Sequence, residues 1–315
     1  MLYTKNLDQK IFNAHQYIPS DELIILSGFV GPTPIHKLSN LSIKTTVIYG
    51  MYGSASISQP LHKVFLQLHQ PPLRNILYSN LPVHSKWYIW KYKGEITYAL
   101  VGSADFSTNG LTIPYRETLA ETSSDTFPEL DNYIKRILNN SVSCNSVNPN
   151  FVNNIKCEMV LYDPRTGEVP LKSGLNWGNS ENGHTKLGDS YIPIRSSHIR
   201  SYPNLFPPKQ NVPTNMSVTG GKANRQNDSI ELIWDDGTLM EALLEGSQNI
   251  DGNSYPKQLS SFPSKNTLGV YIRKRLGLAI NSVVTTQDLE NYGKSKILIQ
   301  YLQEGTYYID FSSRR

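Results

Sequence analysis

The stretch HSKWYIWKYKGEITYALVGSADFS, from His84 to Ser107, decides the fold of the first half of the chain. Two runs rich in aromatic and β-branched residues, 86–94 and 95–103, meet at a Lys-Gly pair, which predicts two antiparallel strands joined by a turn. Because residues two apart on a strand face the same side, His84 and Lys86 should project together. Ser103 and Asp105 should lie near them across the hairpin.

These residue types suit phosphodiester chemistry. A neutral imidazole is a usable nucleophile toward phosphorus, and a neighbouring lysine supplies positive charge for a phosphate oxygen. Glu117, in YRETLAE, is available to hold the far ring nitrogen of a histidine. A His-x-Lys pair or a Gly-Ser turn taken singly is most often structural. Their order and spacing together favour a site.

The residues around this stretch predict an α/β layer structure. Apolar runs at 22–30, 44–52 and 75–81 are expected strands. Helices are expected at 32–40, 56–70 and 126–140, where apolar residues recur at helical spacing or prolines mark a helix start. This strand–helix alternation predicts a mixed sheet flanked by helices, forming one domain over residues 1–143.

The second half has a different character. Residues 144–155 are expected as a linker, and residues 156–315 as a second domain. Short apolar runs punctuated by Gly, Pro and Asn predict a mostly β barrel or sandwich, with one candidate helix at 285–293.

Composition and charge narrow the function class. The chain has 315 residues, a net charge of +4, two cysteines without metal-ligand spacing, and no apolar run of membrane-spanning length. Its beginning lacks the apolar core of a signal peptide, so we expect a cytoplasmic protein. Residues 165–225 carry eight Lys/Arg against three acids, whereas residues 228–251 carry seven acids and no Lys or Arg. Such segregation favours one face directed toward a polyanion, although a solvated face is the ordinary alternative.

The first half resembles the phospholipase D superfamily, through HSK (84–86), GSAD (102–105) and FSTNGLTIPYRE (106–117). The resemblance implies that His84 attacks phosphorus without a metal and forms a covalent phosphohistidine. It also implies that Lys86 and Ser103 bind the phosphate and that Glu117 orients an imidazole, with Glu121 as the alternative for that role.

Two positions depart from the superfamily motif. Asp105 stands where the motif has asparagine, so its role is open, because a carboxylate beside a phosphate is electrostatically unfavourable unless it is protonated or turned away. Lys91 stands where an aspartate is often found. A further HTK, at 184–186, lies in the other domain without a following Gly-Ser. Since the superfamily site needs two facing motifs, a single-motif chain implies a homodimer with one composite site.

The second half resembles the recognition domain of the NgoFVII family of type II restriction endonucleases, through the segments 172–194, 269–278, 288–297 and 306–312. That resemblance implies a DNA-binding pseudobarrel like that of plant transcription factors, attached to the phospholipase-D-like domain. Arg and Asn side chains read base edges, and Lys and Arg contact phosphates. The candidate DNA-binding residues are Lys172, Asn176, Trp177, Lys186, Arg195, Arg200, Arg273, Lys274, Arg275, Lys294 and Lys296.

The leading prediction is a restriction endonuclease that cleaves double-stranded DNA at or near a short specific sequence without a metal. A helicase-like ATPase subunit is a possible partner and the only expected source of an ATP requirement, because the chain contains no P-loop. Two alternatives stay open: a DNA-binding protein with a silent nuclease half, favoured by Asp105, and a phospholipase-D-type phosphodiesterase with another substrate. No carboxylate pair of the metal-dependent nuclease type stands out.

Overall fold

The computed structural model describes residues 1–181, 184–209 and 228–313. It divides into two compact units: unit 1 comprises Met1–Asn153 with Gln303–Gly305, and unit 2 comprises Asn154–Leu302 with Thr306–Arg315. The segment expected as a linker contains a short 3₁₀ turn, η4 (Cys144–Ser146), in which Cys144 is buried. Nearly all of the expected linker, up to Asn153, belongs to unit 1. The basic segment 165–225 is described only in part.

Unit 1 is built on a mixed eight-stranded sheet with the order β1-β7-β6-β5-β2-β3-β4-β8. Its centre, β2-β3-β4, is parallel, and β5 and β6 continue it in antiparallel fashion as the expected hairpin. The strands are β1 (Leu2–Tyr3), β2 (Glu22–Ser27), β3 (Lys44–Tyr49), β4 (Arg74–Ser79), β5 (Lys86–Tyr92), β6 (Glu95–Gly102), β7 (Leu119–Glu121) and β8 (Ser141–Ser143).

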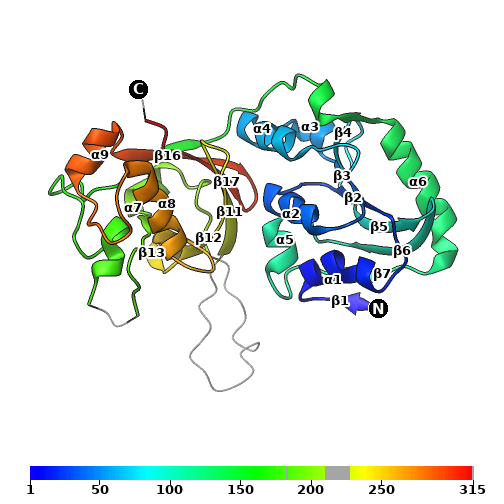
Figure 1. Ribbon diagram of the computed structural model, residues 1–315, viewed down its shortest axis with the longest axis horizontal. Helices are drawn as coiled ribbons and strands as arrows, with labels where there is room; N and C mark the ends of the chain where they lie inside the picture. The colour runs from blue at the N-terminus through cyan, green and yellow to red at the C-terminus, as the bar shows by residue number, and fades with distance from the viewer. Residues whose placement is uncertain (182–183, 210–227, 314–315) are drawn as a thin grey trace, which may run out of the picture. The chain divides into compact units, whose positions relative to one another are not determined.

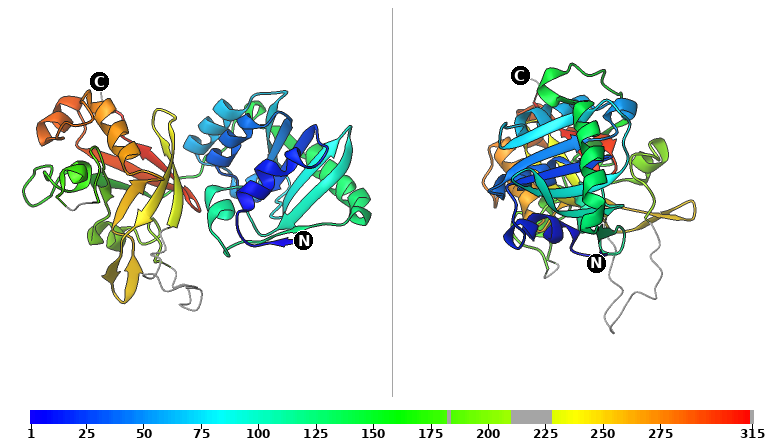
Figure 2. Two further views of the ribbon diagram at one scale, coloured as in Figure 1. Left: turned by 60° about the horizontal axis from the view of Figure 1, so that its bottom comes forward. Right: turned by 90° about the vertical axis from the view of Figure 1, so that its right-hand side faces the viewer.

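Helices cover both faces of this sheet (Figure 1). Helix α6 packs Leu130, Ile134 and Ile137 onto one face, against Ile24 and Ile89 among others; in the right-hand view of Figure 2 it lies across the strands. The alternate residues of the strands, such as Tyr88, are buried on the other face, because side chains alternate along a strand. The helices are α1 (Leu7–Asn13), α2 (Pro32–Lys37), α3 (Tyr52–Ala55), α4 (Gln59–Leu68), α5 (Thr108–Thr112) and α6 (Phe127–Asn139).

The α/β fold class predicted for the first half is thus confirmed, with a mixed sheet between helices. The main correction concerns the strand expected at 22–30, which ends at Ser27. The chain then turns through Gly28 and Phe29 into α2, so these residues lie at the carboxyl end of a central strand instead of inside it.

Unit 2 is mostly β, as expected for a pseudobarrel. Its described residues form a seven-stranded sheet with the order β10-β15-β12-β11-β17-β16-β9, and a separate β13-β14 hairpin. The β11-β17 pair is parallel, whereas the pairs β10-β15, β15-β12, β12-β11 and β16-β9 are antiparallel. The strands are β9 (Lys156–Val160), β10 (Ile192–Pro193), β11 (Asp228–Trp234), β12 (Leu239–Glu245), β13 (Gln248–Ile250), β14 (Asn253–Tyr255), β15 (Gln258–Ser261), β16 (Lys296–Gln303) and β17 (Thr306–Asp310).

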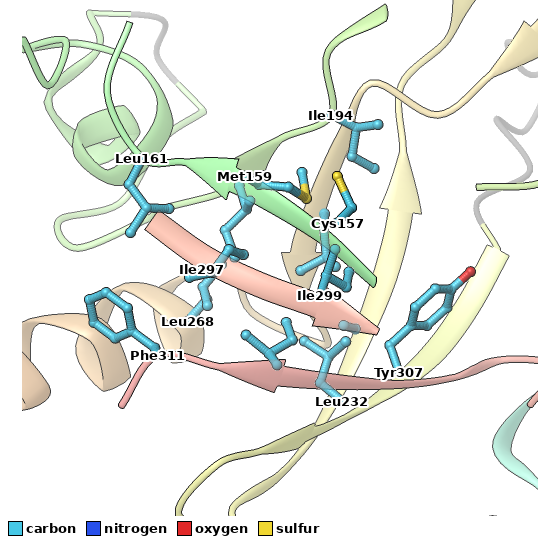
Figure 3. Packing of buried hydrophobic residues seen from close by; sticks show 14 of the residues in the cluster. Cys157, Met159, Leu161, Ile194, Leu232, Leu268, Ile297, Ile299, Tyr307 and Phe311 are labelled. Carbon is cyan, nitrogen blue, oxygen red and sulfur yellow. The ribbon is translucent and has the colours of Figure 1, made fainter. Parts of the chain in front are cut away.

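The core of unit 2 joins strands and helices far apart in the sequence. Figure 3 shows Met159 of β9 and Ile299 of β16 packed in one cluster with Leu232 of β11 and Leu268 of a helix. That helix, α8 (Asn266–Leu276), was not anticipated, although Leu268 and Ile272 lie four residues apart and Gly277 ends it in a left-handed conformation. The other helices are α7 (Ser196–Ser201) and α9 (Thr286–Tyr292), with a 3₁₀ segment η5 (Gly174–Asn179).

Across the residues described in both units, no helix combines the length and the apolar character needed to span a membrane.

Candidate active site and DNA-binding residues

The topology of unit 1 brings three strand ends together at one end of the sheet. Leu26, the penultimate residue of β2, pairs with Trp87 of β5, and Lys86 at the start of β5 pairs with Gly102 at the end of β6. The segments that follow β2 and β6 and the one that precedes β5 therefore meet. Ser27 ends β2, His84 lies in the segment before β5, and Asp105 lies in the segment after β6. Residues distant in sequence thus form one polar cluster.

The centre of this cluster is the Lys86 ammonium group. Lys86 Nζ lies 2.8 Å from the carbonyl oxygen of His84 and 3.0 Å from His84 Nδ1. The Lys86 side chain is only 6% exposed, whereas His84 belongs to the exposed residues. The fold thus presents the imidazole at the surface, with a positive charge held directly behind it.

Asp105 lies on the other side of the same ammonium group. Its Oδ1 is 3.5 Å from Lys86 Nζ, 2.9 Å from Ser27 Oγ, and accepts a hydrogen bond from Phe29 N at 3.0 Å. The carboxylate is thus turned toward Lys86 and the turn after β2.

The turn after β2 is part of the site and escaped the sequence interpretation. A Cβ atom on Gly28 would lie 3.1 Å from His84 Cδ2 and 3.4 Å from Asp105 Oδ1, so a side chain there would crowd the imidazole. Phe29 packs its ring edge-on to His84, with 6.2 Å between the ring centroids. A Ser-Gly pair directly after a buried strand was the available signal.

Ser103 follows β6 and is exposed. Its Oγ accepts a hydrogen bond from Thr118 N at 3.1 Å, and its own backbone N donates to Thr118 O at 3.1 Å. Gly102 allows this approach, because a Cβ there would lie 1.9 Å from Thr118 O. The Gly-Ser pair thus joins β6 to the strand β7 and leaves the serine at the surface.

The two candidate glutamates have different surroundings. Glu117 is partly buried, with its Oε1 3.9 Å from Arg116 Nε. Burial raises the pKa of the Tyr88 hydroxyl well above its ordinary value, and the charges of Asp105 and Glu117 raise it further, so both acids lie near this buried side chain. Glu121 instead accepts hydrogen bonds from Tyr3 and Tyr98, which hold the pKa of its carboxyl below the usual range. Glu121 thus belongs to a hydrogen-bonded cluster with two tyrosines, and its alternative role in orienting an imidazole stays a prediction.

In unit 2, five of the candidate DNA-binding residues have exposed side chains. Lys172 pairs with Glu181, and Arg200 lies 3.4 Å from Asp251, both with side chains at least 60% exposed. Lys186 and Lys274 are exposed as well, and so is Lys296, which pairs with Glu158. Exposed surface ion pairs are weak, so these cations are accessible to a phosphate.

Two candidate DNA-binding residues are interior, and this corrects the sequence interpretation. Asn176 is 0% exposed, and its amide donates to Pro170 O and Val284 O. Arg273 is 2% exposed, and its guanidinium donates to the carbonyl oxygens of Ser282, Gly269 and Leu175, as well as to Asn176 Oδ1. Both residues stabilise the joint between α8 and η5, because each satisfies buried backbone groups.

The other candidates are engaged within unit 2. Arg275 forms a two-pronged ion pair with Asp235 and donates to the hydroxyls of Tyr271 and Tyr292. Arg195 donates to two backbone carbonyls and lines a cavity of about 410 Å³. The remaining pairs are Lys294 with Asp310 and the Trp177 ring with the ammonium of Lys265.

Among the residues that the structure describes, no group of three or more His, Cys, Asp and Glu side chains is arranged to hold a metal ion.

Comparisons with known proteins match both units. A model of the NgoFVII restriction endonuclease N-terminal PLD domain matches residues 5–150. A model of the NgoFVII C-terminal B3-like DNA-binding domain matches residues 150–303. Together the two matches run from residue 5 to residue 303.

Solved structures with similarity to part of the chain include NucT from Helicobacter pylori, with 17% identity and a TM-score of 0.34, over 45% of this chain and 97% of that one. Nuc, a phospholipase D family member from Salmonella typhimurium, has 11% identity and a TM-score of 0.31, over 44% and 88%. Polyphosphate kinase from Porphyromonas gingivalis has 13% identity and a TM-score of 0.31, over 45% and 23%. A comparison with curated proteins finds no match.

Proposed function

The chain belongs to the NgoFVII restriction endonuclease family, and we propose that it cleaves double-stranded DNA at or near a short specific sequence without a metal ion. Family membership makes it a DNA endonuclease with an attached DNA-binding domain. The observation that carries the mechanism is the exposed His84 imidazole with the Lys86 ammonium 3.0 Å from its Nδ1.

In the proposed first step, a ring nitrogen of His84 attacks the scissile phosphorus. A nitrogen–phosphorus bond forms as the bond from phosphorus to the leaving deoxyribose oxygen breaks. Lys86 and the hydroxyl of Ser103 bind the non-bridging oxygens, whose negative charge grows in the transition state. The positions of the two residues support these roles. Lys86 begins β5 two residues after His84, and Ser103 follows Gly102, which ends β6 and pairs with Lys86.

The second imidazole comes from a second copy of this chain. The leaving oxygen takes a proton from the His84 of the partner copy, and Glu117 orients an imidazole for this work. Water then attacks phosphorus, gives a proton to the same imidazole, and the nitrogen–phosphorus bond breaks. Both histidines are regenerated, so the active species is a homodimer with one site on its two-fold axis.

In this proposal, unit 2 recognises the DNA sequence. The exposed cations proposed to contact DNA phosphates are Lys172, Lys186, Arg200, Lys274 and Lys296. A helicase-like ATPase subunit is a further proposed partner. ATP enters only through that subunit.

The deciding experiment is cleavage of mixed-sequence duplex DNA in excess EDTA, with and without ATP and a candidate ATPase partner. Discrete fragments despite chelation support a metal-independent, site-specific nuclease. Fragments that require added Mg²⁺ would overturn the mechanism. Specific binding with no cleavage under any of these conditions would instead support a DNA-recognition protein with a silent nuclease half.

A further inference from the structure

Asp105 stands at a junction between Lys86 and the turn after β2. Its Oδ1 lies 2.9 Å from Ser27 Oγ, 3.0 Å from Phe29 N and 3.5 Å from Lys86 Nζ. Each of these three groups can donate a hydrogen to an ionised carboxylate, which only accepts. The Ser27 hydroxyl has two acceptors within reach, the Phe29 carbonyl oxygen at 2.6 Å and Asp105 Oδ1 at 2.9 Å, and an ionised carboxylate is the stronger acceptor of the two.

The Lys86 ammonium group is held from two sides. His84 supplies its carbonyl oxygen and Nδ1 at 2.8 and 3.0 Å, and Asp105 supplies the only negative charge paired with Lys86 among the described residues. The Lys86 side chain is 6% exposed and that of Asp105 is 25% exposed, so water screens this pair only in part. The charge on Asp105 therefore acts directly on whatever anion approaches Lys86.

We propose that Asp105 is a positioning residue, which acts through Lys86 and not through contact with the phosphate. Its carboxylate, which is held by Ser27 and Phe29, keeps Lys86 next to His84. Its negative charge weakens the attraction between Lys86 and a free phosphate. The inference rests on the proposed roles of His84 and Lys86. It explains why an aspartate is compatible with a phosphate site: the carboxylate is tied to the turn behind the lysine.

The hydrogen bonds that hold the Asp105 side chain and its negative charge can be removed separately by substitution. Asp105→Asn keeps an acceptor oxygen for Phe29 N but removes the charge. Ser27→Ala removes one donor to the carboxylate and leaves the charge in place. Asp131→Asn is the matched control, because Asp131 pairs with Lys91 on the same strand β5, at its other end, with 2.6 Å between Oδ1 and Nζ.

The experiment measures binding of inorganic phosphate to the full chain by ³¹P NMR titration and, separately, the single-turnover rate of DNA cleavage. Asp105→Asn should bind phosphate roughly 3- to 10-fold more tightly and cleave roughly 10-fold more slowly, because attraction to the anion rises while Lys86 loses its tether. Ser27→Ala should slow cleavage without a change in phosphate affinity. Asp131→Asn should change neither, and Lys86→Ala should abolish phosphate binding.

In Asp105→Asn the phosphate affinity should rise while the cleavage rate falls, whereas a loss of structure would lower both. Phosphate affinity in Asp105→Asn that is equal to or below the wild-type value, with an unchanged Tm, overturns the proposal. If that variant fails to fold, an unchanged cleavage rate in Ser27→Ala overturns it. Should the wild type not cleave DNA at all, the proposed function fails, whereas the phosphate titrations still decide the role of Asp105. A wild type that binds no phosphate would overturn the inference as well.

Discussion

Lys86 Nζ lies 3.0 Å from His84 Nδ1, and the carbonyl oxygen of His84 lies 2.8 Å from the same ammonium group. The lysine is buried and the histidine is exposed. A cation held beside an accessible imidazole is fixed in place before a phosphoryl group arrives, and such preorganisation is the usual source of electrostatic catalysis.

His84→Ala should reduce cleavage by about 10³-fold or more, because it removes the proposed nucleophile. Specific DNA affinity should stay within about twofold, since recognition resides in unit 2. Gel-shift titration and single-turnover cleavage measure the two effects. The control is His184→Ala, at the exposed histidine of the other His-x-Lys pair, which should cleave normally. Loss of specific binding in His84→Ala would contradict the division of labour between the units.

Gly28→Ala should lower the cleavage rate roughly 10- to 100-fold with little change in Tm. The new Cβ would lie 3.1 Å from His84 Cδ2, tighter than ordinary van der Waals contact, so the imidazole must shift. Small displacements of a reacting group have effects of this size. The measurement is single-turnover cleavage beside thermal unfolding, and an unchanged rate would show that the site tolerates a side chain there.

Arg273→Met should destabilise unit 2 by about 2–4 kcal/mol, because the buried carbonyl oxygens of Ser282, Gly269 and Leu175 lose their donor. Thermal unfolding should show a lower Tm for the transition that involves unit 2. The neighbouring Lys274→Ala is the control. Its exposed side chain should leave the Tm unchanged, and should weaken DNA binding and reduce the salt slope by about 1. A Lys274→Ala variant with wild-type affinity and salt slope would remove that residue from the DNA surface.

Acid should destabilise unit 2 through His198. Burial, with a smaller effect of the Arg195 charge, lowers the pKa of the His198 imidazole from its ordinary value of 6.5 to about 4. The unfolded chain therefore binds the proton more readily. The stabilising effect of neutral His198 is complete above pH ~6.5 and declines as the pH falls from ~6.5 toward ~4.

The variant His198→Gln keeps a side-chain acceptor for Arg195 N, which His198 Nδ1 supplies at 3.2 Å. Thermal unfolding at pH ~7 and pH ~5 should show a smaller fall in Tm for this variant than for the wild type. Equal falls in the two proteins would assign the acid sensitivity to other groups.

The apolar runs of unit 1 were sufficient to predict the strands β2 to β6, because these runs are rich in β-branched and aromatic residues and the central strands are largely buried. The short strands β1, β7 and β8 were not predicted. Helix α8 was missed because its sequence resembles a solvated basic run. Arg273 in fact points inward and binds backbone carbonyls, which depends on η5 and on the segment before α9. No local pattern distinguishes such an arginine from the exposed Lys274 beside it.

For the site, the sequence by itself determined that His84 and Lys86 lie two residues apart where one strand begins and that Ser103 and Asp105 follow the next strand, because hairpin pairing is a local property. The expectation that His84 lies on the strand itself was wrong, since β5 begins at Lys86. Only the tertiary structure decided that Ser27, Gly28 and Phe29 complete the cluster, because β2 pairs with β5 across nearly sixty residues of sequence. The orientation of the Asp105 carboxylate likewise depends on the tertiary structure. Its carboxylate turns toward Lys86 because the donors that satisfy it come from a strand and turn that the motif itself does not contain.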